Sequence, residues 1–122
     1  MKTGIVLFAH GSRDPLWHAP IQAVQQRIQH QAPGLMVRCA YLELTEPDLP
    51  HCVHEMIALG VRRIRILPLF LGMGRHARED LPRLIAQLRQ AHPDTHVEVL
   101  PALGEDPRLV DLSCQIALDK LD

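Results

Sequence analysis

Short apolar runs alternate with longer amphipathic segments four times along this chain, and this alternation limits the possible folds more than any other feature of the sequence. The runs are rich in Val, Ile and Leu, and Gly, Pro or polar residues bound them; they span residues 5–8, 36–42, 61–67 and 97–100. Runs of this length and composition are typical of buried β-strands. The chain is therefore expected to contain four strands, each followed by a helix.

The segments between the runs have the spacing of one helix face. Their apolar positions are Trp17, Ile21, Val24 and Ile28, then Val53, Met56 and Ile57, then Leu81, Leu84, Ile85 and Leu88, and finally Leu109, Leu112 and Ile116. Thr45 is expected to cap the second helix, with Asp48 in its first turn, and Gly34 and Gly60 fall where helices should end. Repeated right-handed strand–helix–strand units predict a three-layer, doubly wound α/β fold around a mostly parallel four-stranded sheet.

Composition narrows the class of protein further. A chain of 122 residues, 47% of them hydrophobic, suits one domain over residues 1–122. A net charge of -1 gives no reason to expect a nucleic acid or a membrane surface as partner. The first apolar run is too short for a membrane span. Cys39, Cys52 and Cys114 are odd in number and widely spaced, which favours the reducing cytoplasm.

Three strand ends carry side chains suited to a metal ion. His10 follows the first run, Glu43 follows the second, and His76 follows a loop in which Gly72 and Gly74 are expected to take positive φ. Ligands of doubly wound sheets bind at the carboxyl ends of the strands, where these residues would meet. Two neutral imidazoles and a carboxylate suit a borderline divalent metal and leave coordination positions open. The prediction depends on all three meeting, since each one alone is more often a solvated side chain.

Other histidine and glycine chemistries fit less well. A phosphatase with a nucleophilic histidine needs an arginine before it to hold the phosphoryl group, and Ala9 stands in that place. The sequence has no G-x-S-x-G elbow of a serine hydrolase. It also lacks the G-x-G-x-x-G signature of dinucleotide binding.

The three segments together resemble a known family. "HGSRDP", "LELTEP" and "PLFLGMGRHAREDLP", in this order, are similar to the small CbiX-type sirohydrochlorin chelatases, which are ATP-independent class II tetrapyrrole chelatases related in fold to ferrochelatase. The resemblance covers roughly residues 3–115. It implies insertion of a divalent metal into sirohydrochlorin, with cobalt for cobalamin, iron for siroheme or nickel in some relatives. It also implies that the chain matches one half of the two-lobed chelatases and forms a homodimer.

The resemblance assigns roles to single residues. His10 and His76 match the two histidines that bind metal and take part in catalysis, and Glu43 matches the acidic residue near them. Sirohydrochlorin carries eight carboxylates, so Arg13 and Arg75, with Ser12 and the backbone amide of Gly74, are expected to bind the ring's acidic groups. Arg78 is expected to contribute less. Asp80 either orients His76 or favours the start of its helix.

Two functional classes stay open beside the chelatase. A non-catalytic carrier of metal or tetrapyrrole would bind in stoichiometric amounts without accelerating metallation. A histidine phosphatase would hydrolyse phosphoesters, which Ala9 argues against. Cobalt is expected as the metal, although two imidazoles and a carboxylate also accept iron and nickel.

Overall fold

The computed structural model describes residues 2–121 and confirms the alternation of strands and helices. The strands are β1 (Thr3–Ala9), β2 (Met36–Tyr41), β3 (Arg63–Pro68) and β4 (His96–Val99). The helices are α1 (Pro15–Gln31), α2 (Leu49–Ala58), α3 (Arg75–Ala91) and α4 (Pro107–Leu118), with a short 3-10 turn η1 (Leu103–Glu105) before α4. None of the helices in this described range is long and apolar enough to cross a membrane.

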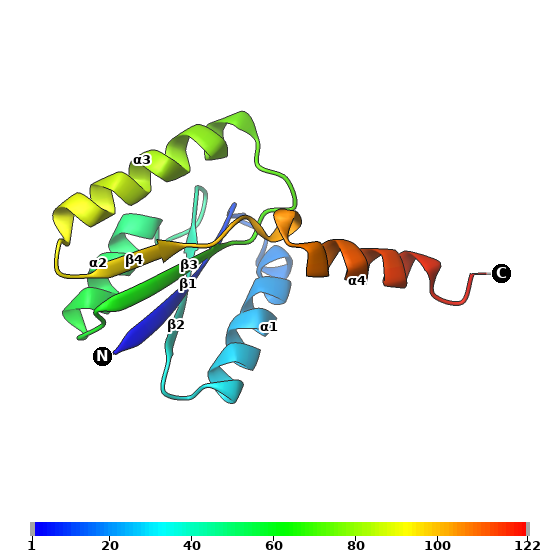
Figure 1. The fold of residues 1–122 in the computed structure, drawn as a ribbon, viewed down its shortest axis with the longest axis horizontal. Helices are drawn as coiled ribbons and strands as arrows, with labels where there is room; N and C mark the ends of the chain where they lie inside the picture. The colour runs from blue at the N-terminus through cyan, green and yellow to red at the C-terminus, as the bar shows by residue number, and fades with distance from the viewer. Residues whose placement is uncertain (1, 122) are drawn as a thin grey trace.

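The four strands form one parallel sheet in the order β2-β1-β3-β4. Helix α1 lies on one face, and α2 and α3 lie on the other (Figure 1). The order reverses between β1 and β3, so the loops after these strands diverge at the carboxyl edge of the sheet. The predicted three-layer α/β fold is therefore confirmed.

The larger core lies between the sheet and the helices α2 and α3. Val6, Phe8 and Ile66 of the sheet are at most 1% exposed, and they pack with Val53 and Met56 of α2. Burying an aliphatic or aromatic side chain of this size contributes roughly 1.5–3 kcal/mol. This face holds the strands in place and fixes where their carboxyl ends lie.

The opposite face is covered over only part of its width. Helix α1 packs on β1 and β2 through Ile21 and Trp17. Farther along the same face, Arg63 and Arg65 of β3 are exposed, although β3 is an interior strand. The sheet is thus covered on one face and half open on the other.

Helix α2 is capped differently from the prediction. Asp48, not Thr45, is the N-cap, and its carboxylate accepts a hydrogen bond of 2.9 Å from the backbone N–H of His51. The Thr45 hydroxyl instead donates to the carbonyl oxygen of Ser12 at 2.6 Å. Thr45 fails to cap because its side chain already ties together the loops that follow β1 and β2.

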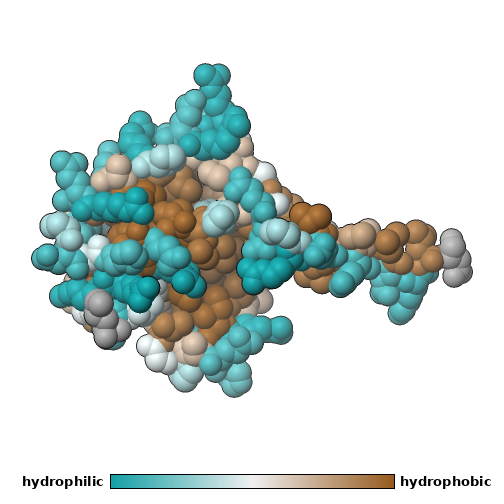
Figure 2. Space-filling view, in the orientation of Figure 1, coloured by the Kyte–Doolittle hydropathy of each residue, from teal (hydrophilic) through white to brown (hydrophobic). Residues whose placement is uncertain are grey.

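Helix α4 forms where the sequence predicts it but leaves the body of the molecule. It projects from the carboxyl edge of the sheet, and brown apolar surface runs along it (Figures 1 and 2). Among its residues only Leu109 is even partly buried. A helical period correctly predicts a helix here, but it does not show which surface the apolar face covers.

Candidate functional site

His10 and Glu43 lie side by side at the carboxyl edge of the sheet. The pairing of β1 with β2 continues past both strands, because the Leu42 N–H donates to the Ala9 carbonyl at 2.9 Å and the Glu43 N–H to the His10 carbonyl at 3.0 Å. The side chains meet with 2.9 Å between His10 Nε2 and Glu43 Oε1. This contact confirms that the ends of β1 and β2 bring their imidazole and carboxylate together.

The pair is open to solvent. The two side chains are 56% and 55% exposed, so their mutual attraction adds little to folding stability. Behind the imidazole stands the buried ring of Phe70, edge-on at 6.4 Å between ring centroids. An imidazole nitrogen and a carboxylate oxygen so exposed can exchange each other for a ligand at low cost.

Gly11 makes the close approach of the two loops possible. Its φ is +104°, a conformation that L side chains rarely adopt, and a Cβ there would overlap the carbonyl oxygen of Glu43. The sequence analysis places positive φ at Gly72 and Gly74 instead, and this was wrong. Gly74 has φ -63°, and Gly11 and Gly60 are the positive-φ glycines among residues 2–121.

Ser12 and Thr45 lock the two loops together from the other side. The Ser12 N–H donates to Thr45 Oγ1 at 3.3 Å, and Ser12 Oγ accepts from the Asp14 N–H at 3.0 Å. His18 Nε2 lies 2.7 Å from the Ser12 carbonyl oxygen, so the nitrogen carries a proton there and donates it. The sequence analysis missed His18, whose only signal was a position in the first turn of a predicted helix.

A hollow of about 620 Å³ adjoins these loops. Ser12, Arg13, His18, Tyr41 and Thr45 line it, together with Leu44 and Glu46. Burial, with a smaller contribution from neighbouring Cys39, raises the pKa of Tyr41 to about 12, so its hydroxyl stays protonated. The hollow therefore offers a cation, an imidazole and a neutral phenol beside the His10–Glu43 pair.

His76 stands apart from the other two predicted ligands. It is the second residue of α3 and is exposed. Within residues 2–121 no three His, Cys, Asp or Glu side chains are placed to hold a metal ion together. The structure brings His10 to Glu43 and leaves His76 on the neighbouring loop of the same edge.

The charged residues next to His76 pair among themselves. Arg75 Nε contacts Glu79 Oε1 at 3.2 Å, and Arg83 contacts Asp80 Oδ1 at 2.7 Å. Gly74 is the N-cap of α3 and supplies no side chain to the helix start. Arg75 is 83% exposed at its side chain, so its ion pair is weak and easily exchanged for another carboxylate.

Comparison with known proteins gives a consistent result. A sirohydrochlorin cobaltochelatase of Methanothermobacter thermautotrophicus is 27% identical over 126 residues, covering 91% of this chain and 87% of that protein. The CbiX protein of Marinobacter aquaeolei VT8, whose name places it in cobalamin (vitamin B12) biosynthesis, has a solved structure that is 31% identical. It superimposes with a TM-score of 0.82 over 98% of this chain and 97% of that chain.

A longer protein shares the fold. The sirohydrochlorin chelatase SirB of Bacillus subtilis subspecies spizizenii, solved in complex with cobalt, superimposes with a TM-score of 0.80 at 24% identity. The match covers 98% of this chain but 51% of SirB, so this chain spans about half of that protein's length. The sequence model of the CbiX family matches residues 4–119. With a family match over nearly its whole length and the same parallel sheet, this chain belongs to the CbiX family.

Proposed function

We propose that this protein is an ATP-independent chelatase that inserts a divalent metal ion, cobalt first among the candidates, into sirohydrochlorin. The observation that carries the proposal is the exposed contact of 2.9 Å between His10 and Glu43 at the open edge of the sheet. The name of the Methanothermobacter relative, a sirohydrochlorin cobaltochelatase, supports the substrate and the metal.

The reaction needs weak metal ligands and proton acceptors in one place. Inserting the metal replaces its water molecules with ring nitrogens and releases two pyrrole protons. His10 and Glu43 are proposed to hold the incoming ion, with His76 as the third ligand contributed from the loop before α3. Since an imidazole titrates near neutral pH, a histidine that has released the metal can accept a proton from the ring.

The same edge offers groups for the acidic substituents of the ring. Arg13 is exposed and lines the hollow beside the pair. Arg75 holds only a solvent-exposed partner, Glu79. We assign both arginines to ring carboxylates, with the backbone amide of Gly74 as a further donor. Ser12 has a supporting part here, because its hydroxyl already accepts the hydrogen bond from Asp14.

We further propose that two copies of this chain form the working enzyme. A planar ring with eight carboxylates is large for the exposed edge of one 13.8 kDa chain. SirB, about twice as long, supports a unit made of two such folds. Residues 1–122 would then be one domain, equal to half of a two-lobed chelatase. The free cysteines Cys39, Cys52 and Cys114 fit a cytoplasmic enzyme of cobalamin or siroheme synthesis.

The test is multiple-turnover metallation of sirohydrochlorin, followed by absorption, with Co²⁺, Ni²⁺ and, without oxygen, Fe²⁺. The protein is kept far below the substrate concentration. We expect the rate to fall by about 10²-fold or more in His10→Ala and in His76→Ala, a typical loss for an acid–base or ligand group. His30→Ala, a histidine near the end of α1, is the matched control and keeps the wild-type rate.

Each other outcome has a clear meaning. Saturable one-to-one binding of metal or ring, without faster metallation by any of the three metals, would replace the chelatase with a carrier. An unchanged rate in His76→Ala alone would remove His76 from the set and leave the His10–Glu43 pair as the metal site.

A further inference from the structure

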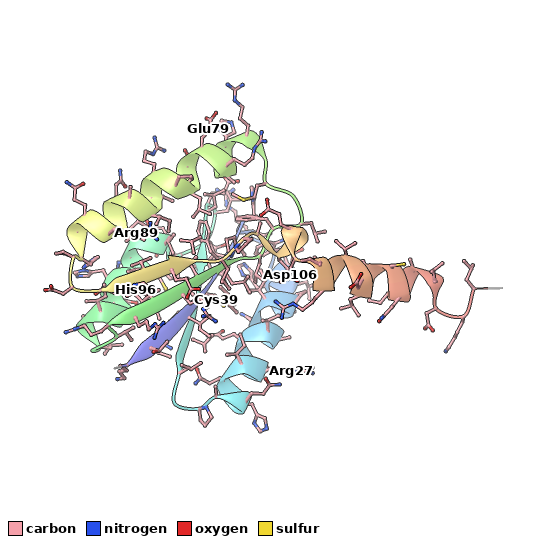
Figure 3. The ribbon with its side chains drawn as sticks, in the orientation of Figure 1. Arg27, Cys39, Glu79, Arg89, His96 and Asp106 are labelled. Carbon is pink, nitrogen blue, oxygen red and sulfur yellow. The ribbon has the colours of Figure 1, made fainter. Side chains whose placement is uncertain are left out.

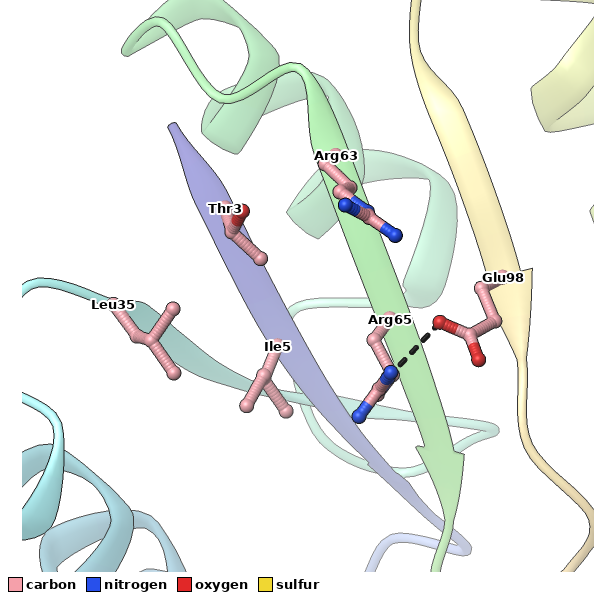
Figure 4. A pocket seen from close by; sticks show the side chains of 6 residues that line it. All are labelled: Thr3, Ile5, Leu35, Arg63, Arg65 and Glu98. Carbon is pink, nitrogen blue, oxygen red and sulfur yellow. Dashed lines mark hydrogen bonds and ion pairs between the residues drawn. The ribbon is translucent and has the colours of Figure 1, made fainter. Parts of the chain in front are cut away.

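The open half of the α1 face is unusual for a parallel sheet. Parallel sheets occur almost only with both faces covered. Here Ile5, Arg65 and Glu98 are registered neighbours across β1, β3 and β4 and point to the same side. With Thr3, Leu35 and Arg63 they line a groove of about 320 Å³ (Figure 4). The Arg65–Glu98 ion pair of 3.0 Å lies across this groove.

Helix α4 has an apolar face with nothing packed on it. Leu109, Leu112 and Ile116 follow each other at helical spacing, and Leu112 and Ile116 are 50% and 67% exposed. Gln115 and Asp111 lie on the opposite side of the helix. An isolated helix of 12 residues is only marginally stable in water, so α4 needs a surface to pack on.

The chain between β4 and α4 directs the helix away from its own open face. The Gly104 N–H donates to the Phe70 carbonyl at 2.9 Å, and a Cβ on Gly104 would overlap the backbone of Leu71. Asp106 then caps α4 through the Arg108 N–H at 2.9 Å (Figure 3). The exit of the helix is therefore fixed to the body on both sides of the turn η1.

We propose that two copies of this chain exchange α4, so that each helix covers the open half of the α1 face on the other copy. The lengths agree: α4 spans about 18 Å, and the six residues of β3 span about 20 Å. The apolar row would rest on Ile5 and Leu35, and the polar side would face solvent. SirB, which has this fold over about half of its chain, supports a second copy as the occupant.

This proposal deepens the dimer that we propose for the chelatase. Helix α4 leaves from the carboxyl edge, the edge that carries His10 and Glu43 (Figure 1). Exchange of the two helices therefore turns the two site edges toward each other. The partner is a second copy of this chain, and the interface has two-fold symmetry.

The first experiment measures dimer dissociation by analytical ultracentrifugation without metal or ring. We expect Leu112→Asp and Ile116→Asp to weaken the dimer by about 30-fold or more, the loss typical of an interface hot spot. Gln115→Asp on the opposite side of α4 is the matched control and leaves dissociation unchanged. Since all three positions are exposed in the single chain, far-ultraviolet circular dichroism should show the body folded in every variant.

The second experiment locates the helix. Ser113→Cys, combined with Cys39→Ser and Cys114→Ser, is labelled with a benzophenone maleimide, and ¹⁴N and ¹⁵N chains are mixed before illumination. We expect cross-links to peptides containing Leu35 or Glu98 of the chain with the other isotope. Cross-links to the same chain, or from α4 to α4, would overturn the exchange, as would a dimer unaffected by Leu112→Asp.

The exchange and the chemistry fail separately. His10→Ala should abolish metallation and keep the dimer. An inactive wild-type protein that still cross-links between chains would refute the chelatase and leave the exchange standing.

Discussion

At the scale of single residues, the strand ends were the part of the site that the sequence could predict. His10 and Glu43 follow strands that turn out to be neighbours, and parallel neighbours end at one edge. The backbone between them was not predictable, because the positive φ of Gly11 comes from its contact with Glu43, 32 residues later in the chain. The role of Thr45 was missed for the same reason, since its partner Ser12 lies on another loop.

Replacement of Gly11 should be costly. In Gly11→Ala the new methyl group must hold an unfavourable φ and overlaps the carbonyl of Glu43, and together these effects should lower the free energy of unfolding by about 2–5 kcal/mol. Urea denaturation measures this change. Gly72→Ala is the control, because no atom lies within 4 Å of its added Cβ; equal losses in both variants would contradict the argument.

At the scale of elements, the period of apolar residues predicted every helix, and the caps needed the structure. Asp14, Asp48 and Asp106 cap α1, α2 and α4, each with a carboxylate that accepts from the first turn. Of these, the sequence analysis placed Asp48 within a helix and Thr45 at its start. Both residues are common caps, so the choice between them depended on a tertiary contact.

Removal of the α2 cap gives a measurable difference between the two candidates. Asp48→Ala should cost about 1 kcal/mol and speed amide exchange at His51, whose N–H then loses its acceptor. Thr45→Ala should leave exchange at His51 unchanged while loosening the loop at Ser12. Faster exchange at His51 in Thr45→Ala would show that Thr45 supports this cap after all.

At the scale of the whole molecule, the fold class was predictable and the coverage of the sheet was not. Alternating strands and helices lead to a parallel sheet because right-handed crossovers leave few other arrangements. Nothing in the spacing of Leu109, Leu112 and Ile116 distinguishes a helix packed on its own sheet from one that projects from it. That distinction depends on the turn at Gly104, which is set by contacts with Phe70 and Leu71.

The core predicts how the stability of the whole molecule changes at alkaline pH. Burial raises the pKa of the Cys52 thiol from 9.0 to about 12. Below pH 9 both states keep the proton; between pH 9 and about 12 the unfolded chain loses it while the folded chain does not, so the free energy of unfolding falls as pH rises.

Denaturation in a reducing buffer across this pH range measures the slope. Cys52→Ala should flatten it, even though the smaller side chain lowers stability at every pH. Cys114→Ser, at an exposed position of α4, should keep the wild-type slope. An unchanged slope in Cys52→Ala would assign the alkaline loss to other groups.

The projection of α4 also affects how such a pair responds to dilution. Two separate chains that exchange helices form a bimolecular assembly, which comes apart as the protein is diluted. Two copies joined in one polypeptide dock the same helices at an effective concentration set by the linker, in the millimolar range for short flexible ones. A chain of twice this length would therefore keep both edges together at concentrations where the short chains separate, without any new contact between them.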